Sequence, residues 1–239
     1  MIRRLVAGVG ELLVTAGVLV LLFLVWQLWW TDVIADRAQE RTTDALVQQW
    51  GGSVAEVNAR PDVATRAEPV PEPPTAVVAD LPSDVVALLR VPRFGEDYVR
   101  PVLEGTAAEV LEEGVGHYGG AAMPGDVGNF AIAGHRTTWG APFKQIADLV
   151  NGDAIVVETA AGYAVYRVSA TEIVLPTDVR VIAPVPSKPG ETPTEAWLTM
   201  TACHPMFSAR ERYVVHALLE STTPRADGPP AALHFEEVA

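Results

Sequence analysis

The chain has 239 residues, of which 49% are hydrophobic and 20% charged, and its formal net charge at pH 7 is −13. This length suits one domain of ordinary size with an anchor or linker, and it excludes two large domains. The acidic balance argues against nucleic acid as a partner, because phosphate binding depends on clustered Lys and Arg.

The N-terminal region contains a long apolar segment. Residues 12–30 carry no charged side chain, and as a helix they would extend roughly 28 Å, close to the thickness of the hydrocarbon core of a bilayer. Arg3 and Arg4 precede this segment and acidic side chains follow it, so the positive-inside rule places the N-terminus in the cytoplasm. Three tryptophans mark the end where the helix should reach the lipid headgroups: Trp26, Trp29 and Trp30.

We therefore expect a cytoplasmic N-terminus over residues 1–11 and a single-pass transmembrane helix over residues 12–30. A cleaved signal peptide is the alternative. It is disfavoured because the apolar stretch exceeds a normal signal h-region and no clear small-x-small cleavage site follows it.

Residues 31–80 have the composition of a connection. Good helix formers continue to Trp50, and Gly51-Gly52 provides a natural stop, which predicts a short helical stalk. Residues 60–80 hold five prolines and little apolar periodicity, as is typical of an extended spacer. The folded domain is expected to begin near Leu81.

Beyond that point, short runs of β-branched and apolar residues alternate with Gly, Pro, Asp and Asn. The predicted strands are residues 85–91, 99–104, 129–133, 154–159, 163–174, 196–203 and 212–220. Two short segments, 106–113 and 141–150, have a helical pattern. The prediction is a mostly β domain over residues 81–222, a closed β-barrel of about eight strands with short helices, followed by a C-terminal tail over residues 223–239.

Cys203 is the only cysteine in the chain, which excludes an internal disulfide and any structural metal site that needs two thiolates. A single cysteine is often a buried, inert thiol. The strand ending at Cys203 alternates between two faces, with Leu198, Met200 and Ala202 on one and Thr199, Thr201 and Cys203 on the other. If the first face packs in the core, the thiol points away from it.

A thiol is a useful nucleophile only as thiolate, so it needs a basic or cationic neighbour. His135 is the best candidate, because it follows the predicted strand 129–133 and so also lies at a strand end. Arg212 opens the strand that should pair as a hairpin with the cysteine strand, where a permanent cation would stabilise an oxyanion. Arg210 has the same strand parity as Arg212 and is a rival for this role.

Together these residues resemble the sortase family over roughly residues 81–222. Sortases carry a Thr-Leu-x-Thr-Cys signature, an upstream catalytic His and an Arg on the next strand; here the signature is Thr199-Met200-Thr201-Ala202-Cys203. Met200 is a nearly neutral exchange for Leu. Ala202 lacks a hydroxyl that in the family adjoins the nucleophile and helps to position substrate. By parity Ala202 faces the core, which favours a packing change without loss of activity.

Further motifs are similar to those of class E sortases, which are membrane enzymes of Gram-positive bacteria: Gly116-His117-Tyr118-Gly119, Pro124-Gly125, Gly128-Asn129-Phe130, Ala133-Gly134-His135-Arg136 and Cys203-His204-Pro205. The resemblance implies His135, Cys203 and Arg212 as catalytic residues, and substrate contacts at Tyr118, Thr199, Thr201 and Ala202. The loop of residues 176–195 would form one wall of the substrate groove.

The resemblance also implies an activity: transpeptidation through a Cys thioester, with cleavage between Thr and Gly of a Leu-Ala/Pro-x-Thr-Gly signal. The partners would be secreted proteins bearing a C-terminal sorting signal, an amine acceptor such as a cell-wall precursor or a pilin Lys, and membrane lipid around the N-terminal helix. The catalytic domain would lie outside the cell. No cofactor and no metal site are expected, since no ligand pair has a recognised spacing.

Two alternatives remain open at this point. A peptidoglycan-acting cysteine hydrolase or L,D-transpeptidase also pairs a Cys with an earlier His, although the usual His-Gly-Cys-x-Arg arrangement is absent. A non-catalytic, membrane-anchored binding module would leave Cys203 inert. An iodoacetamide probe separates these readings, because an unreactive thiol in the folded protein favours the binding module.

Overall fold

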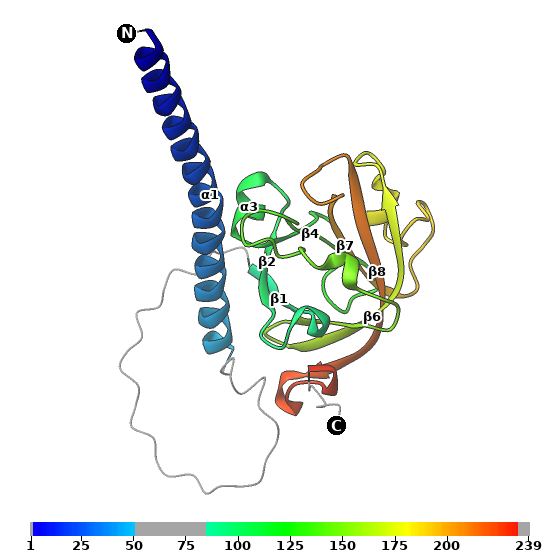
Figure 1. Ribbon diagram of the computed structural model, residues 1–239. Helices are drawn as coiled ribbons and strands as arrows, with labels where there is room; N and C mark the ends of the chain where they lie inside the picture. Colours follow the sequence, from blue (N-terminus) through cyan, green and yellow to red (C-terminus); the bar gives the residue numbers. More distant parts are fainter. Residues whose placement is uncertain (1, 51–84, 234–239) are drawn as a thin grey trace, which may run out of the picture.

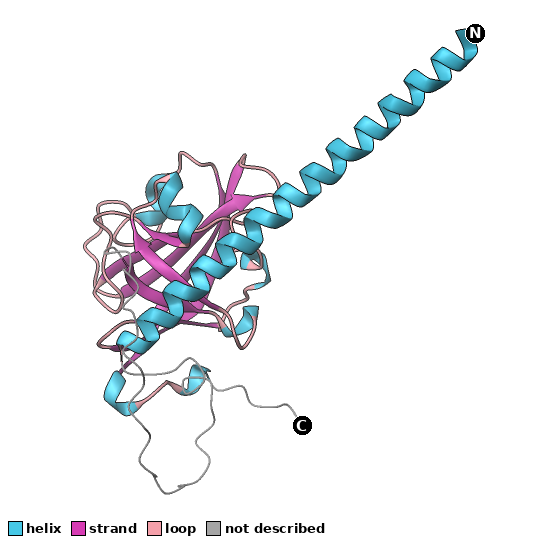
Figure 2. Ribbon diagram, turned by 90° about the vertical axis from the view of Figure 1, so that its left-hand side faces the viewer, coloured by secondary structure: helices cyan, strands magenta, loops and turns pink. Residues whose placement is uncertain are grey.

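The computed structural model describes residues 2–50 and 85–233. The predicted proline-rich spacer, the expected start of the domain at Leu81 and the last residues of the tail lie outside the described residues. A long helix, α1 (Ile2–Gln49), stands beside a barrel that contains every strand of the described residues (Figures 1 and 2). The predicted transmembrane segment and stalk therefore lie on one continuous helix.

The strands close into one barrel in the order β1-β2-β3-β4-β7-β8-β6-β5. Their bounds are β1 (Val85–Arg90), β2 (Val99–Glu104), β3 (Val115–His117), β4 (Gly128–Ala133), β5 (Ala154–Glu158), β6 (Gly162–Val174), β7 (Ala196–His204) and β8 (Glu211–Pro224). The prediction of a closed, mostly β barrel of about eight strands is confirmed. The strand missing from the predicted set is β3, which is only three residues long.

One helix accompanies the strands closely, α3 (Ala108–Glu113), within the predicted helical segment 106–113. Short 3-10 turns fill several connections: η1 (Pro92–Phe94), η2 (Ile146–Asp148), η3 (Val179–Ile182), η4 (Arg225–Asp227) and η5 (Ala231–Leu233). The connection from β6 to β7 contains η3 and is the 176–195 loop of the sequence analysis.

The predicted helix over residues 141–150 is wrong, because this segment contains only η2. Its start is fixed instead by the connection that follows β4, residues 134–142, which we call the histidine loop. The amide of Phe143 donates to the carbonyl of His135 in this loop (2.9 Å). Ala141 has a φ of 41°, which is incompatible with a right-handed helix. Phe143 and Ile146 are buried in the barrel core, so their apolar spacing reflects core packing.

The barrel core confirms the predicted alternation of the cysteine strand. Leu198, Met200 and Ala202 belong to the main buried cluster together with residues from the other strands. The opposite face of β7 is not open to water, because Thr199 and Thr201 are buried too. Other polar side chains must therefore cover this outer face.

Helix α1 is attached to the barrel along its second half. Leu46 and Val47 are buried against Leu88 and Val99 of the first two strands, and contacts with α3 and β2 run along the helix. Within the described residues, Ala7–Leu24 form the one helical window long and apolar enough to cross a membrane. The helix thus has an apolar half that projects from the domain and a half that is packed on it (Figure 2).

Candidate active site

Three neighbouring strands bring the predicted residues to one end of the barrel. β7 lies between β4 and β8, paired parallel with the first and antiparallel with the second. In the second pair Cys203 is directly opposite Arg212, so their side chains lie on the same face with β-carbons about 4.5–5.5 Å apart. The predicted hairpin of the cysteine and arginine strands is therefore present.

His135 reaches the same place from the other side of β7. Ala133 is in register with Thr201, and the amide of Gly134 donates to the carbonyl of Thr201 (3.1 Å). From an extension of that parallel register two residues beyond the end of β4, we infer that His135 lies near Cys203. The nucleophile candidate is thus on the central strand, opposite Arg212 on β8, and the loop that carries His135 follows the strand on its other side.

The surroundings of His135 set its protonation. Burial lowers the pKa of this imidazole below its usual value, against an opposing effect of the Glu112 carboxylate on α3. A neutral imidazole is therefore favoured near neutral pH. That form can accept a proton from a neighbouring thiol.

Arg212 and Arg210 differ clearly in their surroundings. The guanidinium of Arg212 is half-buried, and its Nη1 donates to the carbonyls of Ala209 (3.1 Å) and Glu211 (3.0 Å). Arg210 lies outside β8 in the preceding loop and is exposed. The β8 pairing thus puts Arg212, and not its rival, opposite the cysteine.

Arg136 is a neighbour that sequence reasoning did not assign a role. Its buried guanidinium donates through Nη1 to the carbonyl of Cys203 (3.3 Å) and to Nδ1 of His204 (2.9 Å), and it lies 5.7 Å from the ring centre of Tyr213. It therefore ties the residue after His135 to the backbone of Cys203. The only sequence signal was its place next to His135 in a motif.

The four residues assigned to substrate contact lie in different surroundings. Tyr118 is half-buried, and its hydroxyl lies 3.1 Å from Oγ1 of Thr201, which in turn donates to a backbone carbonyl of β4 (3.3 Å). Thr199 is fully buried, and Ala202 is buried in the core. Of the four, Tyr118 is the one with solvent-exposed area from which to touch a ligand, and the other three are buried.

A hydrogen-bonded cluster covers Thr199. Its Oγ1 lies 2.9 Å from Nδ1 of His216, and Nε2 of that ring lies 3.0 Å from Oε1 of Glu172 on β6. The same carboxylate accepts from Ser187 (2.7 Å) and Arg180 (2.7 Å) in the β6–β7 connection. His216 had no supporting context in the sequence, because its partners lie far along the chain.

The remaining histidines have structural partners. His117 is buried, with Nδ1 2.7 Å from Glu104 and Nε2 3.1 Å from the carbonyl of Ala122, and it stacks on Phe130. The bond to Arg136 occupies one nitrogen of His204, as described above. His234 lies outside the described residues.

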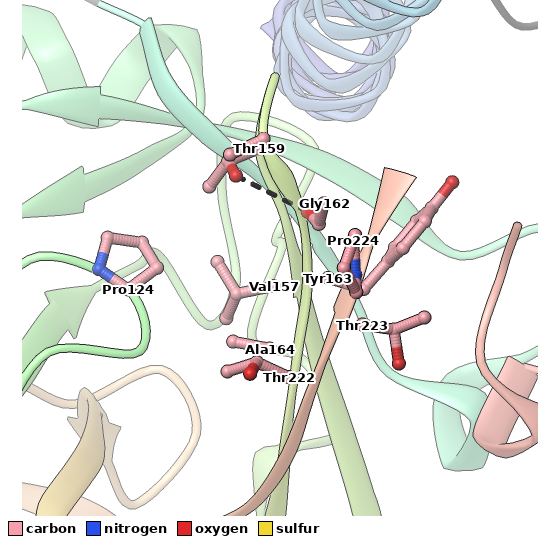
Figure 3. A pocket seen from close by; sticks show the side chains of 10 residues that line it. Pro124, Val157, Thr159, Gly162, Tyr163, Ala164, Thr222, Thr223 and Pro224 are labelled. Carbon is pink, nitrogen blue, oxygen red and sulfur yellow. Dashed lines mark hydrogen bonds between the residues drawn. The ribbon is translucent and has the colours of Figure 1, made fainter. Parts of the chain in front are cut away.

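Among the hollows along the described part of the barrel, two bear on the position of the site. One, of about 340 Å³, lies between the β3–β4 connection and the β6–β7 connection and is lined by Tyr118, Asn129, Ile182 and Pro193, among others. Another, of about 270 Å³, lies where β6 begins and β8 ends, beside Gly162 and Pro224 (Figure 3). The second is at the opposite end of β8 from Arg212 and is lined by no His, Cys or acidic residue.

A closed barrel in which a cysteine pairs with an arginine on the adjacent strand, near a loop that carries a histidine, is an arrangement suited to cysteine-dependent acyl transfer. Residues 89–220 match the family model of the sortase domain. The chain belongs to the sortase family, whose members are generally cysteine transpeptidases.

Relatives of class E support the assignment. Sortase SrtE1 of Streptomyces coelicolor is 35% identical over 234 residues, which cover 95% of this chain and 60% of that protein. Sortase SrtE2 of the same organism is 34% identical over 246 residues, with 95% and 88% covered. The structure of sortase E1 from S. coelicolor with a tripeptide in the active site matches with a TM-score of 0.58 at 38% identity, covering 63% of this chain and 96% of that one.

Proposed function

We propose that this chain is a membrane-anchored sortase that cleaves a Leu-Ala/Pro-x-Thr-Gly sorting signal between Thr and Gly and transfers the acyl group to an amine at the cell surface. The observation that supports the proposal is the pairing of Cys203 with Arg212 across β7 and β8, together with the parallel pairing of β7 with β4, the strand that leads into His135. The lone cysteine of the chain is thus flanked by a base and a fixed cation.

In the first step, the thiol of Cys203 passes its proton to the neutral imidazole of His135 and the thiolate attacks the Thr carbonyl. The C–N bond to Gly breaks, and the imidazolium protonates the leaving amine. An acyl-thioester on Cys203 results. The lowered pKa of His135 supports this order, because a neutral imidazole is ready to accept the proton.

In the second step, an acceptor amine loses its proton to His135 and attacks the thioester, which forms a new amide and frees the thiol. Arg212 would stabilise the oxyanion in both steps, since a guanidinium stays charged throughout. Its present bonds to loop carbonyls leave further N–H donors on the same group.

Arg136 is proposed as a positioning residue. Its bond to the carbonyl of Cys203 holds the histidine loop at a constant separation from the end of β7. Because it touches no reacting atom in this scheme, its role is to keep the imidazole within reach of the thiol.

The substrate would extend from Cys203 into the hollow beside Tyr118, with the β6–β7 connection as its other wall; none of Cys203, His135 and Arg212 lines the hollow itself. The volume of about 340 Å³ is suitable for a few small side chains. The tripeptide in the active site of the similar S. coelicolor sortase E1 supports a peptide ligand. The partners would be secreted proteins that carry such a signal, together with a cell-wall precursor or a pilin Lys as acceptor.

The apolar half of α1 would anchor the chain in the cell membrane with the barrel outside and the N-terminus in the cytoplasm. The support is the exposed apolar window Ala7–Leu24 and the arginines that precede it.

The test is turnover by the full chain in vesicles, with Leu-Ala-x-Thr-Gly and Leu-Pro-x-Thr-Gly peptides, each with and without an amine acceptor. We expect the acyl part to be joined to the amine when it is present. Hydrolysis at the same rate and with the same product in both conditions would instead indicate a cysteine hydrolase. Cleavage of neither peptide would contradict the proposal.

A further inference from the structure

The packing of α1 fixes which end of the barrel faces its apolar half. Near its C-terminal end, the ring of Trp50 lies 5.1 Å from the guanidinium of Arg225, just beyond the last residue of β8. Eleven residues earlier, Nε2 of Gln39 donates to the carbonyl of Trp139 (3.2 Å), in the loop that follows His135. Towards its N-terminus, the helix therefore runs from the Arg225 end of β8 to the histidine loop.

This direction is held by more than one contact. Nη2 of Arg100 lies 3.3 Å from Oδ1 of Asp36, and the buried side of the helix continues through Gln39 to Leu46 and Val47. With contacts spread over about three turns, the helix cannot reverse its direction on the barrel without losing them all. Any membrane crossed by Ala7–Leu24 therefore lies on the active-site side of the domain.

The number of residues along α1 between its contact with the histidine loop and its apolar window gives the distance of the site from the membrane. From Gln39 to Leu24 the axis rises roughly 22 Å at 1.5 Å per residue. The headgroup layer occupies roughly 5–8 Å of that distance. Figure 1 shows that the β7–β8 loop (orange) and the end of β6 (yellow) project from the barrel on the side of the N-terminal half of α1.

The projecting segments carry exposed apolar side chains. Phe207 in the β7–β8 loop is 86% exposed, and Met206 before it is also exposed. Leu175 is exposed immediately after Val174, which pairs with Arg212. We name Leu175, Met206 and Phe207 the apolar rim.

Phe207 also has a φ of 64°, in the left-handed region that favours glycine. An aromatic residue in that conformation loses stability without gaining buried contacts within the domain. Exposure and strain together indicate that the ring is retained for contact with something outside the domain.

We infer that the apolar rim docks on the lipid surface of the membrane that α1 spans, with Phe207 at the headgroup level. The inference rests on the proposed anchoring and adds an orientation: the end of the barrel that carries Cys203 faces the membrane. The substrate class that this geometry favours is a peptide segment held close to the bilayer. Apolar side chains such as Phe and Leu on a membrane-bound surface are buried at the boundary between the headgroups and the acyl chains.

The contact is apolar and does not depend on anionic lipid. α3, which contacts α1, carries Glu109, Glu112 and Glu113 at its exposed or half-buried positions. Acidic side chains near the surface would be repelled by anionic headgroups. We therefore expect immersion of Phe207 in vesicles of phosphatidylcholine alone, and no deeper immersion in vesicles that also contain phosphatidylglycerol.

The single cysteine permits a direct test. In a Cys203→Ala background, Phe207→Cys is labelled with a nitroxide and the full chain is reconstituted in phosphatidylcholine vesicles. The matched control is Met123→Cys, which is 46% exposed and precedes Pro124 beside the hollow at the other end of the barrel. Collision with lipid-soluble oxygen is compared with collision with a water-soluble nickel chelate.

We expect the label at residue 207 to collide several-fold more with oxygen relative to nickel than the label at residue 123. Equal, fully aqueous behaviour of the two labels would overturn the inference. Immersion that appears only after a sorting-signal peptide is added would also overturn it, because the occupant would then be the peptide. Retention of the chain in vesicles after carbonate washing is scored separately, so a failure of anchoring is distinguished from a failure of docking.

Discussion

The carboxylate of Glu172 connects the barrel to the loop that would form one wall of the substrate groove. It accepts hydrogen bonds from Arg180 (2.7 Å) and Ser187 (2.7 Å) in that loop, and it lies 3.0 Å from the ring of His216 on β8. Glu172→Gln keeps the size of the side chain and removes its charge. The amide can satisfy some of these partners, but it cannot pair with the guanidinium.

The magnitude follows from the kind of bonds lost. Burial raises the pKa of Glu172, but the hydrogen bonds from Arg180, Ser187 and His216 outweigh it and lower the pKa to about 2. A hydrogen bond to a charged group contributes about 1.5–3 kcal/mol and a neutral one about 0.5–1.5 kcal/mol. Because the side chain of Arg180 is 37% exposed, its share is reduced by solvent. We expect a loss of about 2 kcal/mol in the free energy of unfolding.

The assay is urea unfolding of the variant together with peptide turnover. The control is Glu220→Gln, which removes an equivalent charge from an exposed pair with Arg167 (2.9 Å) and should cost less than about 1 kcal/mol. Since the loop of Arg180 and Ser187 would line the groove, the KM for peptide should rise while kcat changes little. Equal destabilisation by the two substitutions, or a fall in kcat alone, would refute this reasoning.

Other predictions concern the catalytic groups and pH. Arg212→Ala should lower kcat/KM by at least about 100-fold, the usual effect of losing an oxyanion donor, and Arg210→Ala should leave kcat/KM nearly unchanged. Equal losses in the two variants, or a loss only in Arg210→Ala, would refute the assignment of Arg212. Glu112→Gln removes the charge that opposes the burial of His135, so the pKa of His135 falls further and the acidic limb of the pH–rate profile should move to lower pH. Burial lowers the pKa of His216 below its ordinary value, so the unfolded state binds that proton more readily. Stability should be full above about pH 6.5 and decrease as pH falls, which urea titrations at several pH values would measure.

The barrel and the pairing of its catalytic strands were predictable from the sequence because they depend on local patterns. The alternation of side chains along β7 predicted which residues share a face with Cys203. The short connection from β7 to β8 predicted that the two strands pair as an antiparallel hairpin. β3 was missed because three residues, one of them Gly116, carry too little alternation to be recognised.

The failures concern tertiary contacts between distant parts of the chain. The predicted helix at residues 141–150 had apolar spacing that fits a core-facing loop equally well. The positive φ of Ala141 excludes the helix there, and this angle is seen in the structure but not in the sequence. The bond between His216 and Glu172 joins residues 44 positions apart, and no local pattern marks such a pair. The packing of α1 on the barrel likewise depends on partners that sequence alone does not bring together.

The central claim is that Cys203 carries the acyl group, and intact-mass measurement under single turnover tests it most directly. The full chain is mixed with a Leu-Ala-x-Thr-Gly peptide in the absence of an amine and quenched in acid. We expect an added mass equal to the acyl part up to Thr, located on Cys203, released by an added amine and absent from Cys203→Ala. Cleavage of the peptide by Cys203→Ala at the wild-type rate, or an adduct on any other residue, would contradict the account.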